Sequence, residues 1–165
     1  SPKTGGLDGL ETNANWKLRQ HHKYLSAIRK IQSHGITVNG CFILGLDGDT
    51  PDVFDNVFDF VRESGLYEVQ VTFLTAFPGT PLYRRLKSEG RILRDRAWDL
   101  CTLFDINFQP KNMSVQELQS GFMGLVKRLY NEEETRFRRH GYKERLKSSL
   151  RAGRHAQVMS EQLVA

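Results

Sequence analysis

Residues 40–50, GCFILGLDGDT, combine a strand-like run with a glycine-containing turn that can receive a ligand. Gly45 and Gly48 permit a positive φ angle and a close approach of the backbone to a bound molecule. Thr50 can cap a following helix, and the N-terminus of a helix favours a negatively charged group. Because every loop between a strand and a helix needs turn residues, an ordinary turn is the competing interpretation of this segment.

Residues 75–83, TAFPGTPLY, form a second candidate at the end of another strand-like run. Phe77 offers an apolar wall, and Pro78 and Gly79 fix a turn, so the segment suits a planar base packed beside the backbone. A plain turn between a strand and a helix explains the same residues equally well.

Residues 9–12, GLET, place a carboxylate, Glu11, after a short apolar run. If residues 7–10 end a strand, Glu11 lies near the same edge of the sheet as the other two segments and can bind ribose hydroxyls. A surface position, or an acid in the first turn of a helix, is the alternative that the local sequence favours.

Common nucleophile and phosphate-binding motifs do not occur in the sequence, which has no G-x-S-x-G, Walker loop or H-E-x-x-H. Cys41 and Cys101 lie sixty positions apart without Cys or His neighbours at metal-ligand spacing, so neither a disulfide scaffold nor a zinc site is expected. Each is expected to be a small core residue. Asp47, Asp49 and Asp52 are interpreted as turn and first-turn residues rather than as a metal site.

Hydrophobic periodicity predicts the elements that must position these segments. Helical spacing over 16–34 is followed by a nearly continuous apolar run over 36–46, which predicts a strand buried on both faces. A helix with an apolar stripe follows, with Thr50 as its cap and Gly65 at its end, and a second strand is expected over 67–76. A helix between two strands predicts parallel pairing, so the fold class is α/β.

The region after the second strand predicts one short helix and one ambiguous stretch. The helix is expected over 81–89, and within the following residues, 91–113, a third strand over 103–108 is one interpretation. Two or three strands are too few to close a barrel, which usually needs about eight strands, or about six in a partial barrel. The sequence therefore reads as part of a larger sheet.

The C-terminal third of the chain is predicted to be helical. Ser114 and Glu117 have the spacing of a capping box, which predicts the start of a long amphipathic helix. We expect this helix to run past Arg139, to be interrupted at Gly141 and to fray from Gly153 onward.

Composition fits a folded domain, because 39% of the 165 residues are hydrophobic and 26% are charged. No apolar run approaches the roughly 18 residues of a transmembrane helix, so no membrane span is expected. The polar start does not resemble a signal peptide, and a reducing cytoplasm is the expected location. Since the first residue is serine, we expect the chain to be processed or cut from something longer.

Positive charge is concentrated in residues 127–155, which contain ten Lys or Arg and four Glu, whereas the whole chain has a net charge of +5. This segment can be a solvated amphipathic helix, or it can bind a polyanion. One hypothesis is accordingly a catalytically inactive, standalone α/β module that binds RNA or an acidic partner through this segment. Another is a purely structural α/β fragment without a ligand.

Taken together in this order and spacing, the three candidate segments resemble the second half of a radical S-adenosylmethionine enzyme of the group with an N-terminal cobalamin-binding domain. The resemblance spans roughly residues 9–130. It rests on these segments, in chain order: GLET, AIRKIQSHGITVNGCFILGLDGDTPDVFD, LTAFPGTPLYRRLKSEGRIL and NFQPKNMS.

This resemblance implies the C-terminal part of a partial (β/α) TIM-type barrel, followed by a helical C-terminal region. It implies a parent enzyme that binds a 4Fe-4S cluster and S-adenosylmethionine, forms a 5′-deoxyadenosyl radical and often transfers methyl groups to unactivated carbons with cobalamin. Glu11 matches a position near the ribose and the methionine. Contacts around the adenine are implied for these residues: Ile43, Gly45, Thr50, Phe77, Pro78, Gly79 and Thr80.

The sequence departs from that family in two respects. Cys41 replaces the first glycine of the fifth-strand pattern, with Gly40 displaced by one position, and the Cys-x-x-x-Cys-x-x-Cys cluster motif is absent. Three thiolates must hold the cluster, so its ligands and the cobalamin domain are expected in the remainder of a parent polypeptide. The expected partners are that remainder, an unidentified substrate and an electron donor, and no catalytic residue is assigned.

The resemblance also divides the chain. The barrel part is expected over 1–90, a connecting segment over 91–113, the helical region over 114–152 and a flexible tail over 153–165.

Overall fold

The computed structural model describes residues 23–164, with the backbone only for 154–164. Its elements, in chain order, are α2 (Tyr24–Ser33), β1 (Asn39–Leu44), α3 (Val53–Ser64), β2 (Glu68–Phe73), α4 (Pro81–Ser88), the 3₁₀ helix η3 (Trp98–Leu100), α5 (Val115–Tyr130) and α6 (Glu132–Val164). None of the helices in this part of the chain is both long and apolar enough to cross a membrane.

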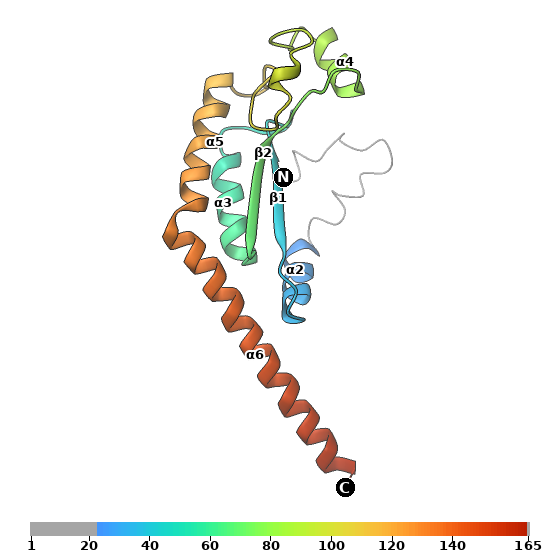
Figure 1. Cartoon of the computed structure of the whole chain (residues 1–165), viewed down its shortest axis with the longest axis vertical. Helices are drawn as coiled ribbons and strands as arrows, with labels where there is room; N and C mark the ends of the chain where they lie inside the picture. The colour runs from blue at the N-terminus through green and yellow to red at the C-terminus, as the bar shows by residue number, and fades with distance from the viewer. Residues whose placement is uncertain (1–22, 165) are drawn as a thin grey trace.

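The two strands and α3 form a parallel β-α-β unit, which confirms the predicted α/β class. β1 pairs with β2 from Asn39 opposite Glu68 to Leu44 opposite Phe73. Both strands therefore end at the same level (Figure 1). Within residues 23–164 the sheet has these two strands, so the partial barrel stays a prediction.

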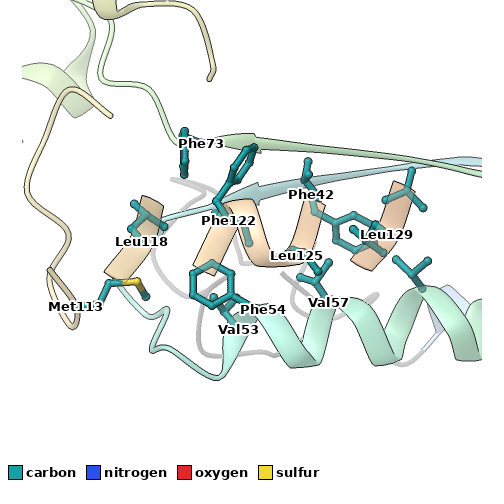
Figure 2. Close-up of a cluster of buried hydrophobic side chains, with 14 of the residues drawn as sticks. Phe42, Val53, Phe54, Val57, Phe73, Met113, Leu118, Phe122, Leu125 and Leu129 are labelled. Atoms are coloured by element: carbon teal, nitrogen blue, oxygen red, sulfur yellow. The ribbon is translucent and has the colours of Figure 1, made fainter. Parts of the chain in front are cut away.

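One face of this sheet forms the core, together with α3 and α5. Figure 2 shows Leu118, Phe122 and Leu125 of α5 lying between the sheet and α3. The ring of Phe122 packs 4.1 Å from that of Phe73, centroid to centroid. Such a core is held by the removal of apolar area from water, about 25 cal/mol per Å².

Most of the opposite face of the sheet is exposed in the described chain, although Thr72 of β2 on that face is buried. Phe42 and Leu44 are buried in β1, whereas Cys41 and Ile43 between them are exposed, as is Gln70 on β2. The expectation of a strand buried on both faces is therefore wrong for these residues, and so is the expectation of Cys41 in the core. The cause is that α3 and α5 both pack on the same side of the sheet.

Helix α3 begins later than predicted. The Thr50 hydroxyl donates to the carboxylate of Asp52, and the Val53 N–H donates to the carbonyl of Thr50 at 2.9 Å, so a turn precedes the first helical residue. Thr50 is therefore not the helix cap. The end is as predicted, because Gly65 has a left-handed conformation with φ of 62°.

The predicted capping box starts α5. The Ser114 hydroxyl accepts from the Glu117 N–H at 3.1 Å, and the Glu117 carboxylate accepts from the Ser114 N–H at 2.7 Å. These two bonds satisfy donors that the first turn of a helix leaves without partners. This feature of the sequence analysis is confirmed.

The helical region breaks at Asn131 and not at Gly141. The backbone of Asn131 is extended, and its side-chain oxygen accepts from the Glu134 N–H at 2.8 Å, which starts α6 as an N-cap. α6 then continues through Gly141 and Gly153 to Val164. The expected interruption at Gly141 and loss of helix from Gly153 are therefore wrong, while the proposed domain division stays a prediction.

Residues 91–113 do not form the strand that was one interpretation of 103–108. They contain η3 and an isolated antiparallel bridge between Ile92 and Phe108. Leu103 has a positive φ of 68°, which no strand residue can adopt.

Gly121 and Gly124 on α5 provide a matched test of the core. A Cβ at Gly121 would lie 2.1 Å from the ring of Phe54, whereas a Cβ at Gly124 would meet nothing within 4 Å. We expect Gly121→Ala to lower the free energy of unfolding by about 1–3 kcal/mol through overpacking. Gly124→Ala should raise it by up to about 1 kcal/mol through helix propensity. Urea denaturation of the two variants checks this, and equal midpoints would contradict the packing of α5 on α3.

Candidate functional site

The loops that leave β1 and β2 begin at one edge of the sheet, where α/β proteins bind their ligands. The Leu74 N–H donates to the carbonyl of Leu44 at 2.8 Å, so the pairing continues to the last residue of β1. The segments that contain Gly45 and Phe77 therefore leave the sheet at the same edge. Glu11, the third candidate, lies outside the described residues.

Ile43 is the last outward-pointing residue of β1. Its side chain is 46% exposed on the mostly exposed face of the sheet, and its strand partner is Thr72. An apolar side chain in this position can pack against a planar ligand.

Gly45 has a packing role in this structure. Its φ is +94°, and a Cβ here would lie 3.1 Å from Leu118 of α5. Its N–H donates to the Asp49 carboxylate at 3.0 Å, as does the N–H of Leu46 at the same distance. The amide of Gly45 is therefore occupied by the protein and is not presented to a ligand.

Asp49 anchors the loop after β1. Its side chain is buried, and this burial raises the pKa of its carboxyl, against the lowering effect of the hydrogen bonds from Leu46 and Gly45. The side-chain amide of Asn112 donates to the carbonyls of Asp47 and Asp49, at 2.8 and 3.2 Å. The loop is therefore fixed by its own Asp49 side chain and by Asn112 in the segment before α5.

Asp47 links the same loop to α4 and to Arg91, three residues beyond its end. Its carboxylate accepts from Arg85 at 2.6 Å and from Arg91 at 2.8 Å, and both guanidinium groups also contact Glu89. Partial burial raises the pKa of Asp47, but the hydrogen bonds from Arg91 and Arg85 lower it overall. Within the described part of the chain, no group of three or more His, Cys, Asp or Glu side chains is placed to hold a metal ion.

The turn after β2 exposes Phe77, whose side chain is 39% accessible to solvent. Gly79 has φ of +89° and leaves open space where a Cβ would stand. The Thr80 hydroxyl donates to the carbonyl of Phe77 at 2.7 Å and accepts from the Tyr83 N–H at 3.2 Å, so it caps α4. Half-buried Pro78 completes the turn.

The predicted residues therefore fall into two groups. Ile43 and Phe77 present free apolar surface at the edge of the sheet, and Gly79 leaves space beside the backbone. Gly45, Thr50 and Thr80 use their hydrogen-bonding groups within the protein.

Asn107 is a residue of this region that the sequence analysis missed. It is 3% exposed; its side-chain amide donates to the carbonyl of Ala76 at 3.0 Å, and its side-chain oxygen accepts from the Ala76 N–H at 3.1 Å. The Asn107 side chain thus forms with Ala76 the two hydrogen bonds that a neighbouring strand would form just beyond β2. Its neighbours in the NFQP stretch carry no local pattern that points to a residue 31 positions earlier.

Residues 93–107 form a loop, here called the excursion, whose two ends are joined by backbone hydrogen bonds. The Leu93 N–H donates to the carbonyl of Asn107 at 3.2 Å, and the Gln109 N–H donates to that of Arg91 at 2.7 Å. The Phe73 N–H donates to the carbonyl of Leu103 at 2.8 Å, which joins the excursion to the last residue of β2.

A hollow of about 790 Å³ lies where α5 meets α6. It is near the start of β2, because the hydroxyl of Tyr130 donates to the carbonyl of Val69 at 2.7 Å. Arg136 and Arg139 line the hollow and pair with Glu132 and Glu68. These pairs reduce the positive charge that it offers to a polyanion.

Comparison with known proteins supplies a family and several relatives. The family described as "Domain of unknown function (DUF4070)" matches residues 80–164. The bacteriochlorophyllide d C-12(1)-methyltransferase of Chlorobaculum tepidum is 28% identical over 107 residues, which are 65% of this chain and 23% of that protein. The hopanoid C-2 methylase of Rhodopseudomonas palustris is 37% identical over 94 residues, 53% of this chain and 18% of the relative.

A cyclase matches more of the chain. The anaerobic magnesium-protoporphyrin IX monomethyl ester cyclase of Cereibacter sphaeroides is 25% identical over 159 residues, 88% of this chain and 26% of the relative. The match therefore spans about a quarter or less of the length of each of these three relatives.

Asn107→Leu should destabilise the protein because it leaves the buried N–H and carbonyl of Ala76 without partners. The expected cost is on the order of 1–3 kcal/mol for each group. Asn112→Leu is the matched control, because it also removes two bonds to the backbone, but from an exposed residue, and its bond to the carbonyl of Asp47 is exposed to water. Urea denaturation checks the difference, and an equal loss in both variants would contradict the role of Asn107.

Asp49→Asn should change how stability depends on pH. Burial raises the pKa of Asp49 in the folded protein above its ordinary value of 3.8, so the favourable contribution of this group is complete below 3.8 and is lost as the pH rises through the folded pKa. Asparagine keeps an acceptor for the two N–H groups without titrating. The stability of Asp49→Asn relative to wild type should therefore increase as the pH rises.

Unfolding free energies measured at pH values on both sides of 3.8 test this prediction. Asp59→Asn, which removes an exposed carboxylate, serves as the control. A difference between Asp49→Asn and wild type that stays constant with pH would refute it.

Proposed function

The chain belongs to the family described as "Domain of unknown function (DUF4070)", and from this premise we propose that it is the C-terminal part of a longer radical S-adenosylmethionine enzyme that transfers a methyl group. Homology to a methyltransferase and a methylase supports the methyl transfer. The observation that carries the proposal is the placement of Ile43 and Phe77 at one edge of a sheet whose adjoining face is mostly exposed.

The residues at this edge fit the adenosine part of S-adenosylmethionine through apolar contact. Ile43 and Phe77 offer side chains on which a planar base can pack, and Gly79 leaves room for it beside the turn. The amide of Gly45 does not contribute a hydrogen bond, because Asp49 accepts it. We therefore assign Gly45 to positioning the loop and Ile43 and Phe77 to binding.

The metal cluster does not fit residues of the described chain. Cys41 is exposed on the sheet and Cys101 is half-buried in the 91–113 segment, and a 4Fe-4S cluster with one open iron needs three thiolates. We propose that the remainder of the parent polypeptide holds the cluster, together with cobalamin where the parent uses it. When bound, these groups would supply one-electron chemistry and a methyl carrier, while Ile43 and Phe77 of this chain bind the adenosine.

The relatives' names support a proposal for the substrate class. One relative is named for a bacteriochlorophyllide, one for a hopanoid and one for a magnesium-protoporphyrin ester. All three are large molecules with fused or linked rings and extensive apolar surface. We propose a molecule of this kind as the methyl acceptor.

The test begins with the full-length coding sequence, which should contain three closely spaced cysteines upstream of Ser1. The full-length protein, reconstituted anaerobically with iron and sulfide and reduced with dithionite, should convert S-adenosylmethionine to 5′-deoxyadenosine. Absence of those cysteines, or of the product, would overturn the proposal.

Ile43→Ala in the full-length enzyme should raise the KM for S-adenosylmethionine about tenfold, because losing a buried apolar contact of about 1.5 kcal/mol corresponds to that factor. Ile36→Ala is the matched control, since Ile36 is 59% exposed but precedes β1 and lies at the other end of the strand. Equal KM values for the two variants would exclude Ile43 from the binding site.

A further inference from the structure

Residues 93–107 expose an unusual amount of apolar surface. The exposed fractions are 66% for Trp98, 60% for Phe104, 49% for Leu93 and 39% for Leu103. Single exposed apolar residues are common, but four large ones on one short excursion are characteristic of a binding surface.

Hydrogen bonds of the protein itself fix the shape of this excursion. The hydroxyl of Tyr83 pairs with Asp95 and accepts from the Arg96 N–H at 2.9 Å, and the Phe104 N–H donates to the Thr102 hydroxyl at 3.1 Å. Together with the bonds at both ends, these bonds fix the backbone that carries the exposed side chains before anything binds, so a ligand does not have to order the loop.

Leu103 is held in a conformation that costs energy. Its φ of +68° is in the left-handed region, which costs a non-glycine residue on the order of 1–3 kcal/mol. The surrounding bonds, including that from Phe73, maintain this conformation with the side chain partly in solvent.

Charges on and beside the excursion are largely paired. Arg94 forms an ion pair with Asp99, and Lys87 pairs with Asp95 at 2.7 Å. The carboxylate of Asp105 accepts from the Thr102 hydroxyl at 2.7 Å. The surface therefore offers aromatic and aliphatic contacts with little net charge, which favours an uncharged apolar ligand over an ionic one.

The position of the excursion links it to the candidate site. Asn107 binds Ala76, directly before Phe77, and Leu103 binds the end of β2. Figure 1 shows this segment beyond the carboxyl ends of the strands, on the same side as α4. A molecule bound on it would lie next to the edge that carries Ile43 and Phe77.

We propose that residues 93–107 form the substrate platform of the parent enzyme, on which Trp98 and Phe104 bind the ring system of a large apolar substrate. This inference rests on the proposed function, because that function makes the adjoining edge the place of the reaction. Aromatic side chains suit this role, since they supply large contact areas at a low cost in conformational entropy.

The experiment uses the full-length protein and two probes of the proposed class, protoporphyrin IX and the fluorescent sterol dehydroergosterol. We expect at least one probe to bind, and Trp98→Ala and Phe104→Ala each to weaken its binding about tenfold, as for central aromatic contacts. Leu150→Ala is the control, because Leu150 is 55% exposed on α6, outside the platform. Thermal midpoints should be unchanged in all three variants, since each side chain is exposed.

A second measurement distinguishes the substrate from the rest of the polypeptide as the occupant. The difference in emission between wild type and Trp98→Phe reports Trp98 alone, and acrylamide should quench it in the free protein but not with the probe bound. Shielding of Trp98 in the free protein, binding of neither probe, or equal affinity in wild type, Trp98→Ala and Phe104→Ala would overturn the platform.

Formation of 5′-deoxyadenosine by the same preparation separates the two proposals. If this activity is present and the affinity for the probe is the same in wild type, Trp98→Ala and Phe104→Ala, only the platform is refuted. If the activity is absent and binding depends on both residues, the radical enzyme is refuted and the apolar binding surface stands.

Discussion

Burial of a single face of the parallel strand pair is the constraint on which the rest of the structure depends. α3 and α5 both pack on the side that carries Phe42, Leu44 and Phe73. α5 comes close to α3 because Gly121 leaves room for the ring of Phe54. The core is completed on that side, so Cys41 and Ile43 of β1 and Gln70 of β2 remain exposed on the other face, whereas Thr72 beside Ile43 is buried.

The two loops at that edge are shaped by polar side chains of the protein. Buried backbone groups must find partners, and here Asp49 satisfies two N–H groups after β1 while Asn107 satisfies both polar groups of Ala76 after β2. The loops therefore do not need a ligand to become ordered. A ligand gains affinity from such preorganisation, because it does not bear the cost of fixing the backbone.

Local patterns in the sequence predicted the parts of this arrangement that depend on neighbouring residues. The Ser114 and Glu117 capping box and the end of α3 at Gly65 are examples. The two hydrogen bonds between Asn107 and Ala76 join residues 31 positions apart, and the burial of one face of the sheet depends on where α5 packs. Neither feature can therefore be predicted from hydrophobic periodicity. The break at Asn131 is also local, but the low helix propensity of glycine favours Gly141 in the sequence, whereas a side-chain cap starts a new helix more effectively than one glycine ends one.

Three arginines of α6 contact the ends of other elements, so part of the positive charge of this helix has a structural role. Arg138 is buried and donates to the carbonyl of Leu129 near the end of α5, and Arg145 donates to the carbonyl of Gly65 at the end of α3, at 2.7 and 2.8 Å. Cations at the C-terminus of a helix are favoured by the unpaired carbonyls and the helix dipole. Arg139 pairs with Glu68 at the start of β2. A basic helix that fixes the ends of three other elements needs no polyanion to explain its charge, so the net charge of +5 does not by itself favour a nucleic-acid partner.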